Sequence, residues 1–172
     1  LPSLGEVPDF HLTERSGREV SLADLHGHPW VVDFIYTRCT GLCPVLGTRM
    51  EELQKDLRGR SDVTLVSVSV DPQYDTPEVL RGYAEKHRAD PDRWLFLTGD
   101  WNATRLLIHE GFKLGVAQGD PNTLDPGELV THSDRLVLVD GTGQIRGYYH
   151  GTEEESVGKV INDLAKLKRD SG

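Results

Sequence analysis

The chain has 172 residues, of which 37% are hydrophobic and 27% charged, the composition of a globular protein large enough to bury one substantial core. Its formal net charge of -9 argues against nucleic acid or an anionic membrane surface as the main partner, because both attract positive charge. No stretch approaches the roughly 18 consecutive apolar residues of a membrane helix. We therefore expect a single soluble domain over residues 1–172. The first residue is not methionine, so the chain resembles a mature or trimmed domain.

Residues 1–29 are predicted to form a hairpin and a lead-in to the domain. Polar and apolar residues alternate on both sides of Ser16 and Gly17, as in two short strands joined by a turn. Residues 30–37 then form a nearly continuous apolar and β-branched run. Such a run is typical of a strand that is buried on both faces.

From Pro44 onward the apolar residues recur at the spacing of an amphipathic helix, which we expect to end near Gly59. The apolar positions of this helix are Leu46, Met50, Leu53 and Leu57. A second buried strand is predicted at residues 64–70. The helix after it is predicted to have Thr76 as its N-cap and Pro77 as its first residue.

A third strand is predicted at residues 94–97, followed by a helix at 101–110 that Asp100 caps. Residues 118–128 are rich in Pro, Gly and Asp, a composition that predicts an inserted loop.

The chain is predicted to finish with a β-hairpin at residues 135–149 and a helix. Thr152 and Glu155 have the spacing of a capping box at the start of that helix. The order of elements predicts an α/β, thioredoxin-like fold: a central mixed sheet with helices on both faces, an N-terminal hairpin, and a C-terminal β-hairpin plus helix. Functional sites in such open sheets form beyond the carboxyl ends of the strands.

The only two cysteines, Cys39 and Cys43, follow the first core strand and lie four positions apart. On an ideal helix their Cβ atoms would be about 5–6 Å apart, whereas a disulfide requires about 3.8 Å. A disulfide therefore needs a distorted turn, which Gly41 makes easy to form. Thiols at a helix N-terminus have lowered pKa values, and Arg38 would lower the pKa of Cys39 further if its side chain lies close.

Soft thiolates select copper(I) or zinc, and two of them need further ligands to complete a metal site. A purely redox pair more commonly has two intervening residues, and burial as small apolar side chains explains the position of the pair poorly. Among the seven histidines, His132 is the predicted third ligand. In a thioredoxin-like topology, the segment that enters the strand after His132 lies against the cysteine loop.

Three segments of the chain, FIYTRCTGLCP, VSVDPQYDTPE and THSDRLVLVDGTGQIRGYY, together resemble the Sco/SenC family of thioredoxin-like copper proteins. That family is associated with assembly of the CuA site of cytochrome c oxidase. The resemblance implies that one copper ion, Cu(I) or Cu(II), is bound by Cys39, Cys43 and His132, with Asp71 in a supporting role. Many family members carry an acidic residue between the two cysteines, and this chain does not.

The resemblance also implies partners and a location. The expected partners are the oxidase subunit that carries CuA and either another copper chaperone or a thioredoxin-like reductant, with no nucleic acid. We expect a monomer outside the cytoplasm, in the periplasm or on the outer face of the cytoplasmic membrane. A segment upstream of residue 1 would anchor it.

Four functions stay open at this point. The first is a copper-binding assembly factor, which is not an enzyme in the sense of turnover. The second is a thiol–disulfide oxidoreductase in which Cys39 attacks and Cys43 resolves the mixed disulfide. The third is a peroxiredoxin-like peroxidase, although the P-x-x-x-T-x-x-C pattern is absent around Cys39. The fourth is a structural zinc domain, which a chain with a core of this size does not need.

Overall fold

The computed structural model describes residues 1–39, 41–113 and 134–171, and the predicted loop at 118–128 lies outside them. The strands are β1 (Gly5–Glu6), β2 (His11–Glu14), β3 (Glu19–Ser21), β4 (Trp30–Ile35), β5 (Thr64–Ser69), β6 (Trp94–Thr98), β7 (Arg135–Val139) and β8 (Gln144–His150). The helices are η1 (Leu22–Leu25), α1 (Leu42–Asp56), α2 (Pro77–Lys86), α3 (Trp101–Leu106), η2 (Leu107–Gly111) and α5 (Glu155–Ser171). None of these helices is long and apolar enough to cross a membrane.

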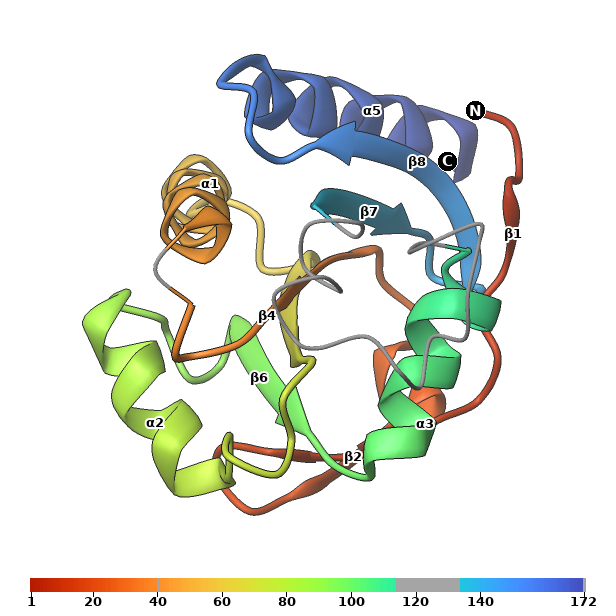
Figure 1. Ribbon diagram of the computed structural model, residues 1–172. Helices are drawn as coiled ribbons and strands as arrows, with labels where there is room; N and C mark the ends of the chain where they lie inside the picture. The colour runs from red at the N-terminus through yellow and green to blue at the C-terminus, as the bar shows by residue number, and fades with distance from the viewer. Residues whose placement is uncertain (40, 114–133, 172) are drawn as a thin grey trace.

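The described strands form one mixed sheet in the order β1-β8-β7-β4-β5-β6-β2-β3. The three central strands β4, β5 and β6 are parallel, and the predicted hairpins β2–β3 and β7–β8 are antiparallel. Figure 1 shows α1, α2 and α5 on one side of the curled sheet and α3 on the other. The predicted arrangement of a mixed sheet between helices is confirmed.

Two of the predicted helix caps are confirmed. The side chain of Thr76 accepts a hydrogen bond from the backbone N–H of Val79 at 3.3 Å, and Asp100 accepts one from Ala103 at 3.0 Å. The first core strand is shorter than predicted and ends at Ile35. Helix α1 begins two residues before Pro44, which therefore lies in the first turn. Backbone N–H groups of the first turn have no partner within the helix, so the N–H that proline lacks costs no helical hydrogen bond.

Two helix predictions were wrong in detail. The helix predicted at 101–110 is α-helical only to Leu106. Phe112 N–H then bonds the carbonyl of Leu107 at 2.8 Å, a π-helical bond. The capping box at Thr152 is also wrong, because residues 151–154 form turns and α5 begins only at Glu155. In those turns Ser156 N–H bonds the carbonyl of Glu153 at 3.1 Å.

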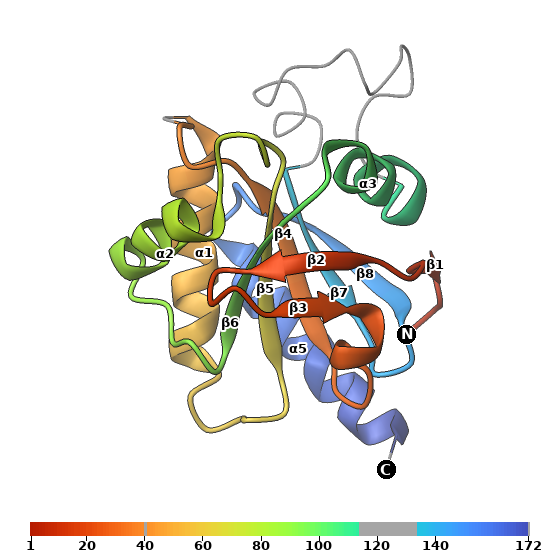
Figure 2. The ribbon, with the colours of Figure 1, turned by 90° about the horizontal axis from the view of Figure 1, so that it is seen from below.

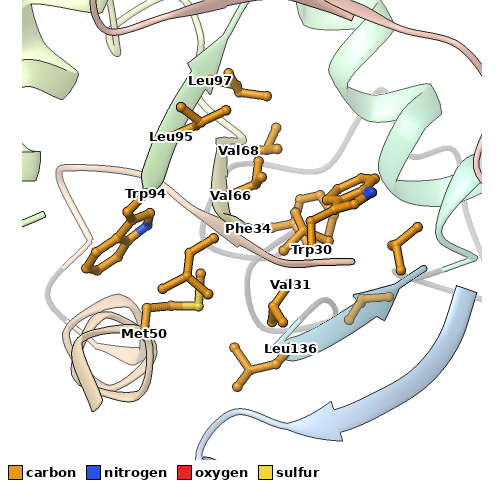
Figure 3. Packing of buried hydrophobic residues seen from close by; sticks show 14 of the residues in the cluster. Trp30, Val31, Phe34, Met50, Val66, Val68, Trp94, Leu95, Leu97 and Leu136 are labelled. Atoms are coloured by element: carbon orange, nitrogen blue, oxygen red, sulfur yellow. The ribbon is translucent and has the colours of Figure 1, made fainter. Parts of the chain in front are cut away.

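The side chains of β4 divide the core between the two faces of the sheet. Trp30 and Phe34 pack against Phe112, which follows η2, with ring centroids 6.1 and 5.3 Å apart. Figure 3 shows these two rings on the opposite side of the strand from Met50 of α1. Asp33, between them in the sequence, points to the side of α1 and α2, because successive side chains of a strand alternate between faces.

Asp33 is a carboxyl group in the centre of the apolar core, with 0% of its surface exposed. Its Oδ1 accepts a hydrogen bond from the Ser67 hydroxyl at 2.5 Å, and Trp94 Nε1 donates to the same hydroxyl at 2.9 Å. Its Oδ2 has no hydrogen-bond partner among the described residues. Burial raises the pKa of Asp33 from 3.8 to about 7, although the bond from Ser67 opposes the change.

The raised pKa of Asp33 links the stability of the fold to pH. Between the unfolded pKa of 3.8 and the folded pKa of about 7, the folded chain holds a proton that the unfolded chain has lost. We therefore expect the free energy of unfolding to fall as the pH rises through this window, by up to about 4 kcal/mol. Urea denaturation of the wild type and of Asp33→Asn from pH 4.5 to 8 measures this pH-dependent part of the free energy of unfolding.

Asp33→Asn should show a flatter pH profile and exceed the wild type in stability at pH 8. An Asp56→Asn variant is the control, because Asp56 is exposed at the end of α1 and should leave the profile unchanged. Parallel profiles for Asp33→Asn and the wild type would contradict the assignment.

Candidate functional site

The two cysteines lie at the carboxyl edge of the parallel strands β4 and β5. Cys39 is four residues past the end of β4, and Cys43 is in the first turn of α1. Figure 2 shows the connection from β4 to α1 beside the turn that joins β5 to α2, at one end of the sheet. The pairing of Ile35 with Ser69 at the ends of the two strands brings these connections together. The site therefore lies where an open α/β sheet is expected to carry one.

The two thiols have unequal surroundings. Both are free, and Cys39 is partly exposed whereas Cys43 is fully buried. The backbone N–H of Cys43 donates a hydrogen bond to Cys39 Sγ at 3.4 Å. Cys39 thus occupies the anion-stabilising position at the start of α1, where the first N–H groups have no partner within the helix.

The surroundings move the two pKa values in opposite directions. Burial alone would raise the pKa of Cys39, but hydrogen bonds from the Cys43 thiol and from the backbone of Cys43 and Gly41 bring it below its ordinary value. For Cys43, burial raises the pKa strongly, and the hydrogen bond to Cys39 raises it further. Cys39 is therefore the thiol that ionises and Cys43 is its proton-bearing neighbour.

Arg38 does not act on the thiol in the way that the sequence predicted. Its guanidinium donates to Asp71 Oδ2 at 2.7 Å and lies over the ring of Tyr74 at 4.2 Å. Arg38 is exposed and Asp71 is buried, so the carboxylate fixes the arginine at the rim of the site. Hydrogen bonds, and not a charge from Arg38, account for the lowered pKa of Cys39.

Asp75, directly before the N-cap Thr76, has a role at the site that was not identified from the sequence. Its carboxyl group is fully buried and accepts hydrogen bonds from Thr37, next to the cysteine loop, and from Ser69 at the end of β5. Burial raises the pKa of Asp75, and these hydrogen bonds oppose the change. The only sequence signal for this role was an aspartate directly before the Thr-Pro start of α2.

His132, the predicted third ligand, lies outside the described residues. The other histidines are spread over the molecule and do not gather at the cysteines; His87 ends α2, His109 lies in η2, and His150 is exposed at the end of β8. Across residues 1–39, 41–113 and 134–171, no three His, Cys, Asp or Glu side chains converge in a group that could hold a metal ion. The described part of the site thus supplies two sulfur donors.

This arrangement supports two kinds of chemistry. A thiolate of lowered pKa beside a second thiol is a donor pair that suits a soft metal ion such as copper(I), provided that a further ligand is present. The same pair can attack a disulfide through Cys39 and then close on itself through Cys43. Both reactions need the open edge at which Cys39 lies.

Comparison with known proteins gives one consistent family. The family model described as SCO1/SenC matches residues 4–169. The SCO1 protein homolog of Bacillus subtilis is 32% identical over 160 residues, which are 92% of this chain and 81% of that protein. A protein of Stutzerimonas stutzeri that is named for copper binding is 28% identical over 150 residues, 86% of this chain and 71% of that protein.

Solved structures agree. A SCO1/SenC family lipoprotein from Bacillus anthracis has a TM-score of 0.83 and 28% identity, over 96% of this chain and 97% of that chain. The solved structure of BsSco has a TM-score of 0.81 and 31% identity, over 96% of this chain and 95% of that chain. BsSco is described as having a disulfide switch and as a member of the Sco family of cytochrome c oxidase assembly proteins. The predicted thioredoxin-like fold is thereby confirmed, and the chain belongs to the SCO1/SenC family.

Proposed function

We propose that this protein binds one copper ion through Cys39, Cys43 and His132 and serves assembly of the CuA site of cytochrome c oxidase. The observation that carries the proposal is the unequal pair of thiols at the open edge of the sheet, one partly exposed with a lowered pKa and one buried. A relative named for copper binding and BsSco, from a family of oxidase assembly proteins, support it. His132 enters through the family resemblance.

Copper is the cargo of this site. Two thiolates and an imidazole form a soft donor set that suits copper(I), and one further oxygen donor would suit copper(II). Asp71 supports the site through Arg38, which it holds at the rim. The partial exposure of Cys39 would leave the ion accessible to the acceptor's own ligands. We propose the oxidase subunit that carries CuA as that acceptor.

We propose that the same cysteines also reduce a disulfide in the acceptor. The Cys39 thiolate attacks one sulfur of that disulfide, so that a mixed disulfide forms and one acceptor thiolate leaves. Cys43 then loses its proton to the leaving thiolate or to water and attacks Cys39 Sγ. The Cys39–Cys43 disulfide forms, the second acceptor thiol is released, and two electrons have passed to the acceptor. A thioredoxin-like reductant would return Cys39 and Cys43 to the dithiol by supplying two electrons, and another copper chaperone would supply the next copper ion.

The proposed location is outside the cytoplasm, where the oxidase presents its soluble copper domain. The similarity to a lipoprotein of the same family supports a membrane-anchored form. We propose an anchor upstream of residue 1 and a single chain as the working unit.

An anaerobic titration with copper(I), in competition with a coloured chelator, tests the ligand set. We expect the reduced wild type to bind one copper per chain, and His132→Ala and Cys39→Ser to bind at least about tenfold more weakly, since each loses one donor. His150→Ala is the matched control, because His150 is exposed at the end of β8. If His132→Ala binds as tightly as the wild type, the three-ligand site is wrong, and disulfide exchange without copper becomes the leading function.

Alkylation of the reduced protein tests the division of roles between the thiols. We expect iodoacetamide at pH 7 to modify Cys39 at least about tenfold faster than Cys43, because only Cys39 is partly exposed and has a lowered pKa. Mass spectrometry of the peptides measures both rates. In Cys39→Ser, Cys43 should stay unmodified until urea unfolds the chain. Equal rates at the two cysteines in the folded protein would rule out this assignment of attacking and resolving thiols.

A further inference from the structure

The turn between β5 and α2 holds the segment that leads to Cys39. The backbone N–H of Thr37 donates to Asp75 Oδ2 at 3.1 Å, and the Thr37 hydroxyl donates to Oδ1 at 2.5 Å. The Ser69 hydroxyl donates to Asp75 Oδ2 at 2.7 Å. A single side chain thus collects three hydrogen bonds, two of them from a residue 38 positions earlier in the chain.

The helix that follows Asp75 makes no use of this carboxyl group. Thr76 caps α2 with its own side chain, and the backbone N–H of Asp75 bonds the carbonyl of Asp71 at 2.9 Å. The side chain of Asp75 is therefore free to face the cysteine loop. Because it is fully buried, loss of its partners would leave polar groups unsatisfied inside the protein, which is costly.

The position of Thr37 fixes that of Cys39. Only Arg38 separates the two residues, and the backbone N–H of Cys39 bonds the carbonyl of Tyr36 at 3.2 Å, which closes a tight turn around Thr37. At the other end of the loop, Cys43 is held in the core by α1. The separation of the two sulfur atoms therefore depends on how firmly Thr37 is held.

We propose that Asp75 is a positioning residue that acts through Thr37 and favours the dithiol form of Cys39 and Cys43 over their disulfide. The bonds between Asp75 and Thr37 occur in a structure in which both cysteines are free. The two thiols are within hydrogen-bonding reach of each other, whereas a disulfide joins its sulfur atoms at about 2.05 Å, so at least one cysteine must move toward the other. The inference rests on the proposed thiol chemistry and adds the group that sets its equilibrium.

The test is the equilibrium between dithiol and disulfide in dithiothreitol or glutathione redox buffers. It is measured for the wild type, Asp75→Asn, Thr37→Val, the double variant and Thr37→Ser. We expect each of the first two single variants to shift the equilibrium constant at least about threefold toward the disulfide, and the double variant to shift it no further than either one. Thr37→Ser keeps the hydroxyl and should behave as the wild type.

Asp62→Asn is the matched control. Asp62 is also an aspartate with hydrogen-bonded partners, but it pairs with Arg60 in the connection between α1 and β5, away from the cysteines. The variant should leave the equilibrium unchanged. If Asp75→Asn fails to fold, Thr37→Val against Thr37→Ser carries the test, because Thr37 is only partly buried.

A merely structural role for Asp75 would lower the thermal midpoint of unfolding and leave the redox equilibrium where it was. That result in Asp75→Asn and Thr37→Val overturns the inference, as does a double variant whose shift is the sum of the two single shifts. If the wild type forms no Cys39–Cys43 disulfide in any redox buffer, both the inference and the proposed disulfide chemistry are wrong. If the wild type forms the disulfide and the variants have the same equilibrium constant as the wild type, only the role of Asp75 is wrong.

Discussion

The parallel pairing of β4 with β5, which runs from Trp30 opposite Thr64 to Ile35 opposite Ser69, is the constraint on which the site depends. Parallel neighbours end at the same edge of a sheet, so the cysteine loop after β4 and the turn after β5 must meet there. Their meeting allows one turn to supply both Asp71, which holds Arg38, and Asp75, which holds Thr37. The hydrogen bonds of the site follow from strand order.

The early start of α1 has the second large effect, because it makes the two thiols unequal. A helix that began at Pro44 would leave both cysteines in a loop, with similar exposure. Since α1 begins at Leu42, Cys43 is drawn into the core, and its backbone N–H points at Cys39 Sγ. Because the helix starts two residues earlier, one sulfur is ionisable and accessible and the other is buried. Proteins that transfer metal or exchange disulfides need such a division, since one sulfur must meet the partner first.

Local signals in the sequence were enough for the elements and for the position of the cysteines. Apolar runs predicted the parallel strands, and the caps Thr76 and Asp100 marked two helices correctly, because these features depend on neighbouring residues. The role of Asp75 was not predictable in this way. Its partner Thr37 is 38 positions away, and no periodicity relates the two. The π-helical turn before Phe112 was missed for a similar reason, since Phe112 packs against Trp30 and Phe34, far away in the sequence.

Two buried carboxyl groups from different parts of the chain act on the two sulfur atoms separately. Burial is the main cause of the raised pKa of Cys43, and the charge of Asp33 beneath the helix adds to it. Asp75 reaches the other sulfur through the backbone, by fixing Thr37. The first effect is electrostatic and weakens when Asp33 binds its proton near pH 7, whereas the second is geometric. Substitutions at the two aspartates should therefore alter different properties of the pair, the proton affinity of one thiol and the spacing between both.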